Sequence, residues 1–340
     1  MAILTTQLPE IAFPFELDTL EFEAEEGDEL STRILIEYDY ETIIDEELYF
    51  DSDGKISIED LASLLIDFIK DTTEEHIFSV TVGGEMSSCY LMACTVDLDK
   101  PAMQVVNESF LSPLMGPKTT YLNGEEFLRV YSIGGSEDLS VRAKFLSESG
   151  DVYSVERVFS DGVDTSYAML RVSPTQILSM LDKPDGTLLD YTVTVGKRMQ
   201  RYIVRQQNAE EIIYFLNSFL EEDTFYVAHI EKEVKPTRTM VNIKGKRKVV
   251  YVDPSAKTKA TSFPLMDSEL PLAEDLVCAK DVWLKDKYMV AITDNDFKHT
   301  SDSAELPRLS VTWQPSAKRL SHKTSTIPQT FDKTFDETYG

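Results

Sequence analysis

The sequence predicts a mostly β protein, with tandem β-sandwich-like modules, each with a short helix, followed by a third β-rich domain. Runs of alternating apolar and polar residues dominate the chain, turn pairs containing glycine separate them, and one strand–helix–hairpin pattern occurs twice. The 340 residues are 42% apolar and include 17 Phe, 15 Tyr and 2 Trp, but only 14 Gly and 14 Pro. This composition excludes a wholly disordered or collagen-like chain, and it supplies apolar material for several domains of roughly 100–200 residues.

Residues 1–100 are predicted to form an acidic β module. They contain 26 acidic and four basic residues, and so carry −22 of the total net charge of −27. This change in composition predicts a domain boundary near residues 99–101. Alternation predicts strands over residues 19–24 and 33–40, and leucines at helical spacing after two acids predict a short helix over residues 61–68.

Residues 101–208 are predicted to form a second repeat of this β module. The segment Val80-Thr81-Val82-Gly83-Gly84-Glu85-Met86 recurs as Val193-Thr194-Val195-Gly196-Lys197-Arg198-Met199. A strand and a short helix precede both segments, and the second helix is expected to begin at Pro174 with Ser173 as its N-cap. Tyr90 has a counterpart near Tyr202. Each repeat is therefore predicted to run strand, short helix, loop and hairpin.

Residues 209–314 are predicted to form a β-rich domain with a basic hairpin that turns at Lys244 and Gly245. Seven cations lie between Lys232 and Lys248 on an otherwise acidic chain. The candidate docking surface consists of Lys235, Arg238, Lys244, Lys246, Arg247 and Lys248. One interpretation is docking to an acidic surface, with residues 1–100 of a neighbouring copy of the chain as the partner. The other is a solvated hairpin whose lysines prevent edge pairing.

Nucleic acid is not an expected partner, because aromatic residues do not alternate with these cations and the chain as a whole is strongly acidic. Residues 315–340 lack periodicity, and they are expected to be either a disordered tail or an arm docked on a partner.

Two acidic segments resemble cation-binding loops. Residues 51–60 place Asp51 and Asp53 on the third and fifth positions of an EF-hand loop, but Tyr49 stands at the first position. The second repeat has no acidic loop at this place, so a tight hairpin turn without calcium is expected. Residues 293–296, with Asp302 and Glu305 downstream, are also predicted to form a turn rather than a cation site.

No motif for catalysis, a cofactor or a metal is found, and a non-enzymatic protein is predicted. The four histidines lack zinc-ligand spacing, and no phosphate-binding loop or nucleophile elbow occurs. The three cysteines are expected to be buried and reduced. No apolar run long enough to span a membrane and no secretion signal are present, so synthesis in a reducing cytoplasm is expected.

The last third of the chain contains a recognisable pattern of strand and turn residues. It consists of Ile213-Tyr214-Phe215-Leu216-Asn217-Ser218-Phe219, Glu222-Asp223-Thr224-Phe225, Val290-Ala291-Ile292-Thr293-Asp294-Asn295-Asp296, Leu306-Pro307-Arg308-Leu309-Ser310-Val311-Thr312-Trp313 and Ala317-Lys318-Arg319. This pattern, over about 110 of the 340 residues, resembles structural proteins of phages and prophages of gut Bacteroidetes, chiefly tail-associated ones. It departs from the usual pattern at Leu220-Glu221, where a turn containing glycine is expected.

The resemblance implies tandem β domains without chemistry of their own. The predicted function is that of a non-enzymatic structural protein of a phage virion, in the tail or baseplate, made in the host cytoplasm. The predicted partners are copies of itself, as a homo-oligomer, and other virion proteins. The alternative is a carbohydrate- or host-surface-binding β module, with exposed Tyr and Trp as stacking platforms.

Overall fold

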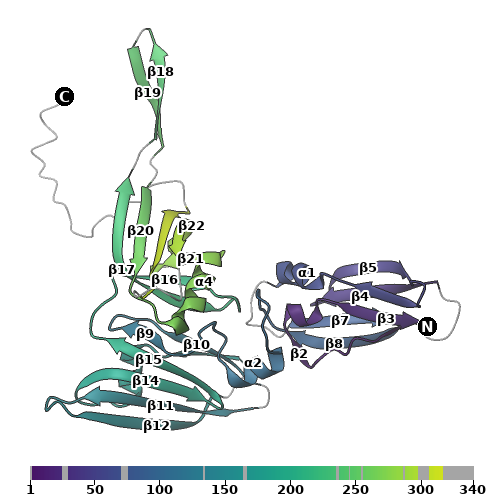
Figure 1. Cartoon of the computed structure of the whole chain (residues 1–340), viewed down its shortest axis with the longest axis horizontal. Helices are drawn as coiled ribbons and strands as arrows, with labels where there is room; N and C mark the ends of the chain where they lie inside the picture. The colour runs from purple at the N-terminus through teal and green to yellow at the C-terminus, as the bar shows by residue number, and fades with distance from the viewer. Residues whose placement is uncertain are drawn as a thin grey trace, which may run out of the picture.

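The computed structural model describes residues 2–24, 30–69, 76–132, 135–163, 167–234, 237–244, 246–253, 256–285, 288–297 and 306–316. This part of the chain is mostly β, which confirms the predicted fold class, and it contains two five-stranded sheets and a closed six-stranded barrel. Figure 1 shows the two sheets and the barrel as distinct bodies, with a two-stranded hairpin that extends from the barrel.

The first five-stranded sheet lies within the acidic first hundred residues. Its strands, in spatial order, are β2 (Ile11–Ala12), β8 (Glu85–Leu91), β7 (His76–Val82), β4 (Ser31–Tyr38) and β5 (Glu41–Tyr49). A three-stranded sheet accompanies it, in the order β1 (Ala2–Leu4), β3 (Leu20–Ala24), β6 (Lys55–Ile58), together with the short helices η1 (Pro14–Leu17) and α1 (Leu61–Phe68). Alternate residues of β4, such as Ile34 and Ile36, are buried in the core between these layers, as period-2 patterning requires.

The second five-stranded sheet has the same design. Its strands are β9 (Lys118–Tyr121), β15 (Arg198–Arg205), β14 (Thr187–Val195), β11 (Glu137–Leu146) and β12 (Val152–Val163), and the pair β10 (Phe127–Tyr131) and β13 (Tyr167–Arg171) accompanies it, with α3 (Pro174–Met180) after β13. Helix α2 (Ala102–Glu108) connects the first sheet to the second. Alternate residues of β11 are buried, namely Leu139, Val141, Ala143 and Phe145.

The two sheets share one strand order. In each, the first strand pairs in parallel with the last, and the other pairs are antiparallel. Val82 and Val195 end β7 and β14, which hold the same place in the two sheets. The counterpart of Tyr202 is Cys89 rather than Tyr90, because Cys89 is buried opposite Phe78 just as Tyr202 is buried opposite Tyr191. The domain boundaries after residues 100, 208 and 314 stay a prediction.

The barrel is formed by the later strands. In order around it they are β16 (Glu211–Leu216), β17 (Glu222–Val234), β20 (Ala256–Ser262), β23 (Leu309–Pro315), β22 (Tyr288–Phe297) and β21 (Val282–Leu284), and η2 (Asp267–Glu269) and α4 (Leu270–Cys278) lie between β20 and β21. Phe215, Phe225, Leu276 and Trp313 are among the residues of its buried core. The basic hairpin is β18 (Thr237–Ile243) and β19 (Lys246–Asp253), inserted between β17 and β20.

Helices α1 and α3 confirm the two predicted helices, and Ser173 is the N-cap residue of α3 as predicted, although its side chain makes no capping hydrogen bond. The Ser173 hydroxyl instead accepts a hydrogen bond from the backbone N–H of Glu126 at 3.0 Å. Helices α2 and α4 were not predicted. The strand predicted over residues 33–40 ends at Tyr38, because Tyr38 pairs with Glu41 and leaves Asp39 and Tyr40 as a two-residue turn with positive φ.

Both predictions for the acidic segments need correction. Residues 293–296 are not a turn but part of β22, where Asp294 pairs with Thr312 beyond a bulge. Residues 51–54 do form a tight turn, with the Gly54 N–H donating to the Asp51 carbonyl at 3.1 Å. It is not a hairpin turn, however, because β5 and β6 belong to different sheets. Among the described residues, no helix is long and apolar enough to cross a membrane.

Candidate functional site

The basic hairpin projects from the barrel as a separate two-stranded ribbon (Figure 1). The last pair of β17 and β20 is Val234 with Ala256, and the first pair of β18 and β19 is Thr237 with Asp253. The chain between these pairs contains one proline on each side, Pro236 and Pro254, and proline has no N–H to donate to a ladder. The sequence therefore favours a break between the ribbon and the barrel at this place.

The structure places five of the six candidate docking residues on this ribbon, all of them exposed. Arg238 lies on β18, Lys244 lies in the turn with a φ of 51°, and Lys246, Arg247 and Lys248 begin β19. Lys235 lies outside the described residues. Lys248 pairs with Val241 and Arg247 with Asn242, so the cations are divided between the two faces of the ribbon.

Exposed apolar side chains lie among these cations. Met240 is 56% exposed, Val241 44% and Val249 47%. A two-stranded ribbon with water on both faces is marginal by itself, because it buries little apolar surface. A partner that covered these faces would bury apolar area as well as satisfy charge. The docking surface predicted from the sequence contains the cations only and does not include these apolar residues.

A second feature is the β16–β17 loop, residues 217–221, where both sheets and the barrel meet. The Asn217 side chain closes the loop, accepting the N–H of Phe219 at 2.9 Å and of Glu221 at 3.1 Å. Its amide also donates to the Leu111 carbonyl at 3.1 Å, in the segment after α2. The loop is therefore fixed by its own side chain and by the chain that connects the two sheets.

The loop holds the first sheet through backbone and apolar contacts. The Thr95 N–H donates to the Ser218 carbonyl at 2.8 Å. Phe219 is buried against Phe13, with ring centroids 5.9 Å apart. Leu220 packs on the core of the first sheet.

The loop holds the second sheet through one carboxylate. Glu221 is buried and accepts hydrogen bonds from Arg129 Nε at 2.9 Å and from the Tyr167 hydroxyl at 2.7 Å. Arg129 lies on β10 and Tyr167 on β13, so a single side chain binds both strands of that pair. A buried charge held by two partners is costly to disrupt, because breaking one contact leaves the other group unpaired.

Leu220 explains why this loop departs from the pattern expected at Leu220-Glu221. Its φ is 56°, a left-handed conformation that glycine adopts without cost and leucine does not. Glycine in that place would have no side chain to pack on the first sheet. The contact of Leu220 with the first sheet thus outweighs the local backbone preference at this position.

We expect Leu220→Gly to be less destabilising than Leu220→Ala, the reverse of the usual order for these residues. Both variants lose the packing of Leu220, but only glycine removes the left-handed strain, which is worth about 1 kcal/mol. Urea unfolding of the two variants measures the order. A glycine variant less stable than the alanine variant would contradict this account.

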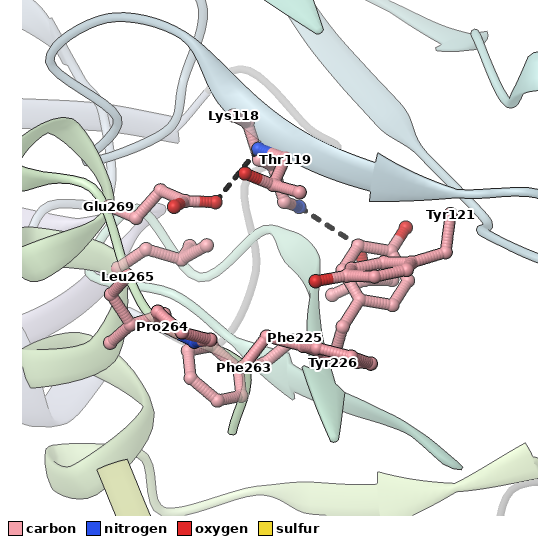
Figure 2. Close-up of a pocket in the computed structure, with 11 residues that line it drawn as sticks. Lys118, Thr119, Tyr121, Phe225, Tyr226, Phe263, Pro264, Leu265 and Glu269 are labelled. Atoms are coloured by element: carbon pink, nitrogen blue, oxygen red, sulfur yellow. Dashed lines mark hydrogen bonds between the residues drawn. The ribbon is translucent and has the colours of Figure 1, made fainter. Parts of the chain in front are cut away.

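A buried ionic cluster joins the second sheet to the barrel. Lys118 on β9 donates to Glu126 at 2.8 Å, to Asp223 at 3.1 Å and to Thr224 at 3.0 Å. The side chains of Lys118 and Glu126 are 2% and 1% exposed. Glu126 also accepts the Tyr226 hydroxyl at 2.6 Å. Figure 2 shows Lys118 and Thr119 of β9 beside Tyr226 of β17.

The cluster perturbs the titration of its members. Burial opposes the charged form of Lys118, but attraction by Asp223 and Glu126 outweighs it, so the pKa of Lys118 is raised. Burial raises the pKa of Glu126 above that of an ordinary glutamate, although Lys118 acts in the opposite direction. Glu269 accepts the Thr119 N–H at 2.8 Å, and burial raises its pKa too. The carboxylates of this cluster stabilise the junction between the second sheet and the barrel.

Beside the cluster lies a cavity of about 20 Å³, lined by Lys118, Thr119, Tyr121, Thr224, Phe225, Tyr226, Phe263, Pro264, Leu265, Glu269 and Leu272 (Figure 2). It has room for one water molecule and not for a substrate. Tyr121 stacks on Phe263 with centroids 4.3 Å apart and helps to close it.

The second sheet also differs from the first at Arg198. This side chain is buried and donates to the Val106 carbonyl of α2 at 2.7 Å, to Glu137 at 2.6 Å and to the Tyr131 carbonyl at 2.6 Å. Its counterpart in the recurring segment, Glu85, is exposed. The recurrence gave no signal for this role, which depends on where α2 packs.

The remaining candidates take structural positions. The Asp51 carboxylate accepts the N–H groups of Asp53 and Lys55, both at 2.8 Å, and these bonds lower its pKa. Within the described residues, no group of three or more His, Cys, Asp or Glu side chains could hold a metal ion. Cys89 and Cys94 are free and buried, and burial raises the pKa of each to about 12. Cys278 is exposed, which corrects the expectation that all three are buried.

No protein-family model and no curated protein matches the chain. A chain in the virion of a native gene transfer agent particle is 12% identical, with 33% of this chain and 95% of that chain covered and a TM-score of 0.23. A chain in the tail of an empty gene transfer agent particle is also 12% identical, covering 34% of this chain and 98% of that one, with a TM-score of 0.24. The calcium-binding domain CBD12 of CALX1.1 is 11% identical, with coverages of 58% and 79% and a TM-score of 0.17. Similarities at these TM-scores carry no functional conclusion.

Proposed function

We propose that the protein is a non-enzymatic structural protein of a phage virion, in the tail or baseplate, that acts by assembling with copies of itself and with other virion proteins. The residue pattern of the last third supports the virion assignment. The observation that carries the assembly function is the projecting basic hairpin. It presents cations and apolar side chains on both faces, and a covered ribbon of this composition is more stable than a solvated one.

The junctions between the sheets and the barrel suit this function. Glu221, Phe219 and Lys118 hold three β units together through buried contacts. An assembly subunit must present its docking surfaces in a fixed relation, and buried hydrogen-bonded contacts between the β units restrict their relative movement. The hairpin is then the projecting element on an otherwise firmly joined scaffold.

The triple variant Lys246→Glu, Arg247→Glu, Lys248→Glu tests the proposal. We expect the parent to sediment as an oligomer at about 50 mM salt and to dissociate as salt rises, because exposed charges are screened. The variant should associate at least about tenfold more weakly, since three exposed pairs become repulsive. Analytical ultracentrifugation measures the difference, and circular dichroism checks the fold.

The matched control is Arg142→Glu, Lys183→Glu, Lys197→Glu. It makes the same charge change at exposed sites in the part of the chain that forms the second sheet. It should assemble like the parent. Equal assembly by the parent and the hairpin variant would contradict the proposal. A shift of DNA by the parent at physiological salt would replace it with a nucleic-acid function.

A further inference from the structure

We propose that the hairpin of one copy of the chain docks on the acidic edge of a second copy, so that copies associate head to tail. The acidic edge is strand β5 with its end residues: Tyr40, Glu41, Asp45, Glu46, Glu47 and Tyr49. The inference rests on the proposed assembly function and names the surface that receives the hairpin.

Strand β5 is an open sheet edge in the described part of the chain. It pairs with β4 on one side only, and the pairing runs from Tyr49 opposite Ser31 to Glu41 opposite Tyr38. Its other side presents backbone N–H and C=O groups along nine residues. Such an edge is a template for a strand of another chain unless it is covered.

The charges of this edge are only partly neutralised within the chain. Asp45 pairs with Arg33 at 2.7 Å, and Glu47 accepts the Ser31 hydroxyl at 2.6 Å. Glu41 and Glu46 are exposed and have no ion pair among the described residues. The whole first hundred residues carry −22, so a cationic partner is attracted over the full surface.

The hairpin is complementary to this edge. Residues 235–252 contain six cations and no acid. Its strands β18 and β19 pair with each other, and within the described residues each has one free backbone edge. Met240, Val241 and Val249 supply exposed apolar area, and the exposed rings of Tyr40 and Tyr49 offer faces on which Arg and Lys can stack.

The contact must be between copies. Figure 1 shows the hairpin extending from the barrel away from the first sheet. Because donor and acceptor are different surfaces, the contact is heterologous. Such contacts close into rings or continue as filaments.

A charge exchange tests the inference. The acceptor variant is Glu41→Lys, Glu46→Lys, Glu47→Lys, and the donor variant is the hairpin triple variant described above. Each alone should lose at least about tenfold in self-association. Mixed in equal amounts, they should form large oligomers in which the two variants alternate, because the hairpin of each variant meets an edge of opposite charge only on the other variant. Combined in one chain, the six substitutions should restore large oligomers at low salt.

The matched control is Glu59→Lys, Asp67→Lys, Glu85→Lys. It makes the same charge change at exposed sites elsewhere in the first hundred residues. It should assemble like the parent. If the acceptor variant assembles normally while the donor variant does not, the hairpin docks elsewhere; the inference then fails and the assembly function stands. If neither variant changes association, or if the parent is monomeric at low salt, both fail.

Discussion

Replacing Lys118 by methionine is expected to cost about 3–5 kcal/mol of stability at neutral pH. The substitution keeps an unbranched side chain one atom shorter than lysine, but it leaves Glu126 and Asp223 buried without their cation. The loss should appear as a lower urea midpoint and a lower calorimetric transition temperature. The control Lys144→Met removes an exposed lysine 3.7 Å from Asp190 and should cost less than about 1 kcal/mol.

The same variant should regain stability in acid. Burial already raises the pKa of Glu126, and removal of the cation raises it further. A carboxyl group whose pKa is higher in the folded than in the unfolded state binds protons more tightly when folded. Lowering the pH from 7 toward 5 therefore narrows the difference in free energy of unfolding between the variant and the parent. Adding Glu126→Gln to the Lys118→Met variant should recover part of the lost stability at pH 7. A difference in free energy of unfolding that stays constant with pH would contradict this account.

Replacing Phe219 by alanine is expected to cost about 3–5 kcal/mol and to loosen the first sheet from the rest of the chain. Phe219 is 4% exposed and belongs to the apolar cluster that contains Phe13, Met92 and Ala102. Its loss opens a cavity where the first sheet, α2 and the β16–β17 loop meet. Limited proteolysis should show faster cleavage near residues 95–101, and small-angle scattering should show a larger radius of gyration.

The matched control is Phe225→Ala. Phe225 is equally buried, at 3% exposed, but lies in the barrel core away from the first sheet. It should cost a similar amount of stability without faster cleavage near residues 95–101. Equal cleavage of both variants would show that Phe219 has no particular role in holding the first sheet.

The strands and the basic hairpin could be predicted because their signals are local. Leu139 and Val141 alternate with polar residues, and Lys244-Gly245 is a turn pair between two apolar runs. Even the recurring segment around Val82 and Val195 can be found by comparing short stretches. In each case the residues that carry the signal also form the structure.

The junctions could not be predicted in this way. Arg129 and Glu221 are 92 residues apart, and Lys118 and Asp223 are 105 apart, so one sequence holds no sign that they meet. Lys118 begins a strand in which all four residues are buried, where a lysine is not expected. In the sequence, the residues that join the two sheets and the barrel therefore look like ordinary polar residues. Only the fold brings them into contact.

The position of the β16–β17 loop late in the chain has a consequence during translation. Thr95 and its partner Ser218 are 123 residues apart, so at 5–20 residues per second about 6–25 seconds separate the synthesis of the two. The strands of both sheets are synthesised before the loop that joins them. A prematurely terminated chain would thus lack the joining loop and also the hairpin that follows it. A truncated product would contain the strands of both sheets but not the proposed donor hairpin, so under the docking proposal it could not extend an assembly through that hairpin.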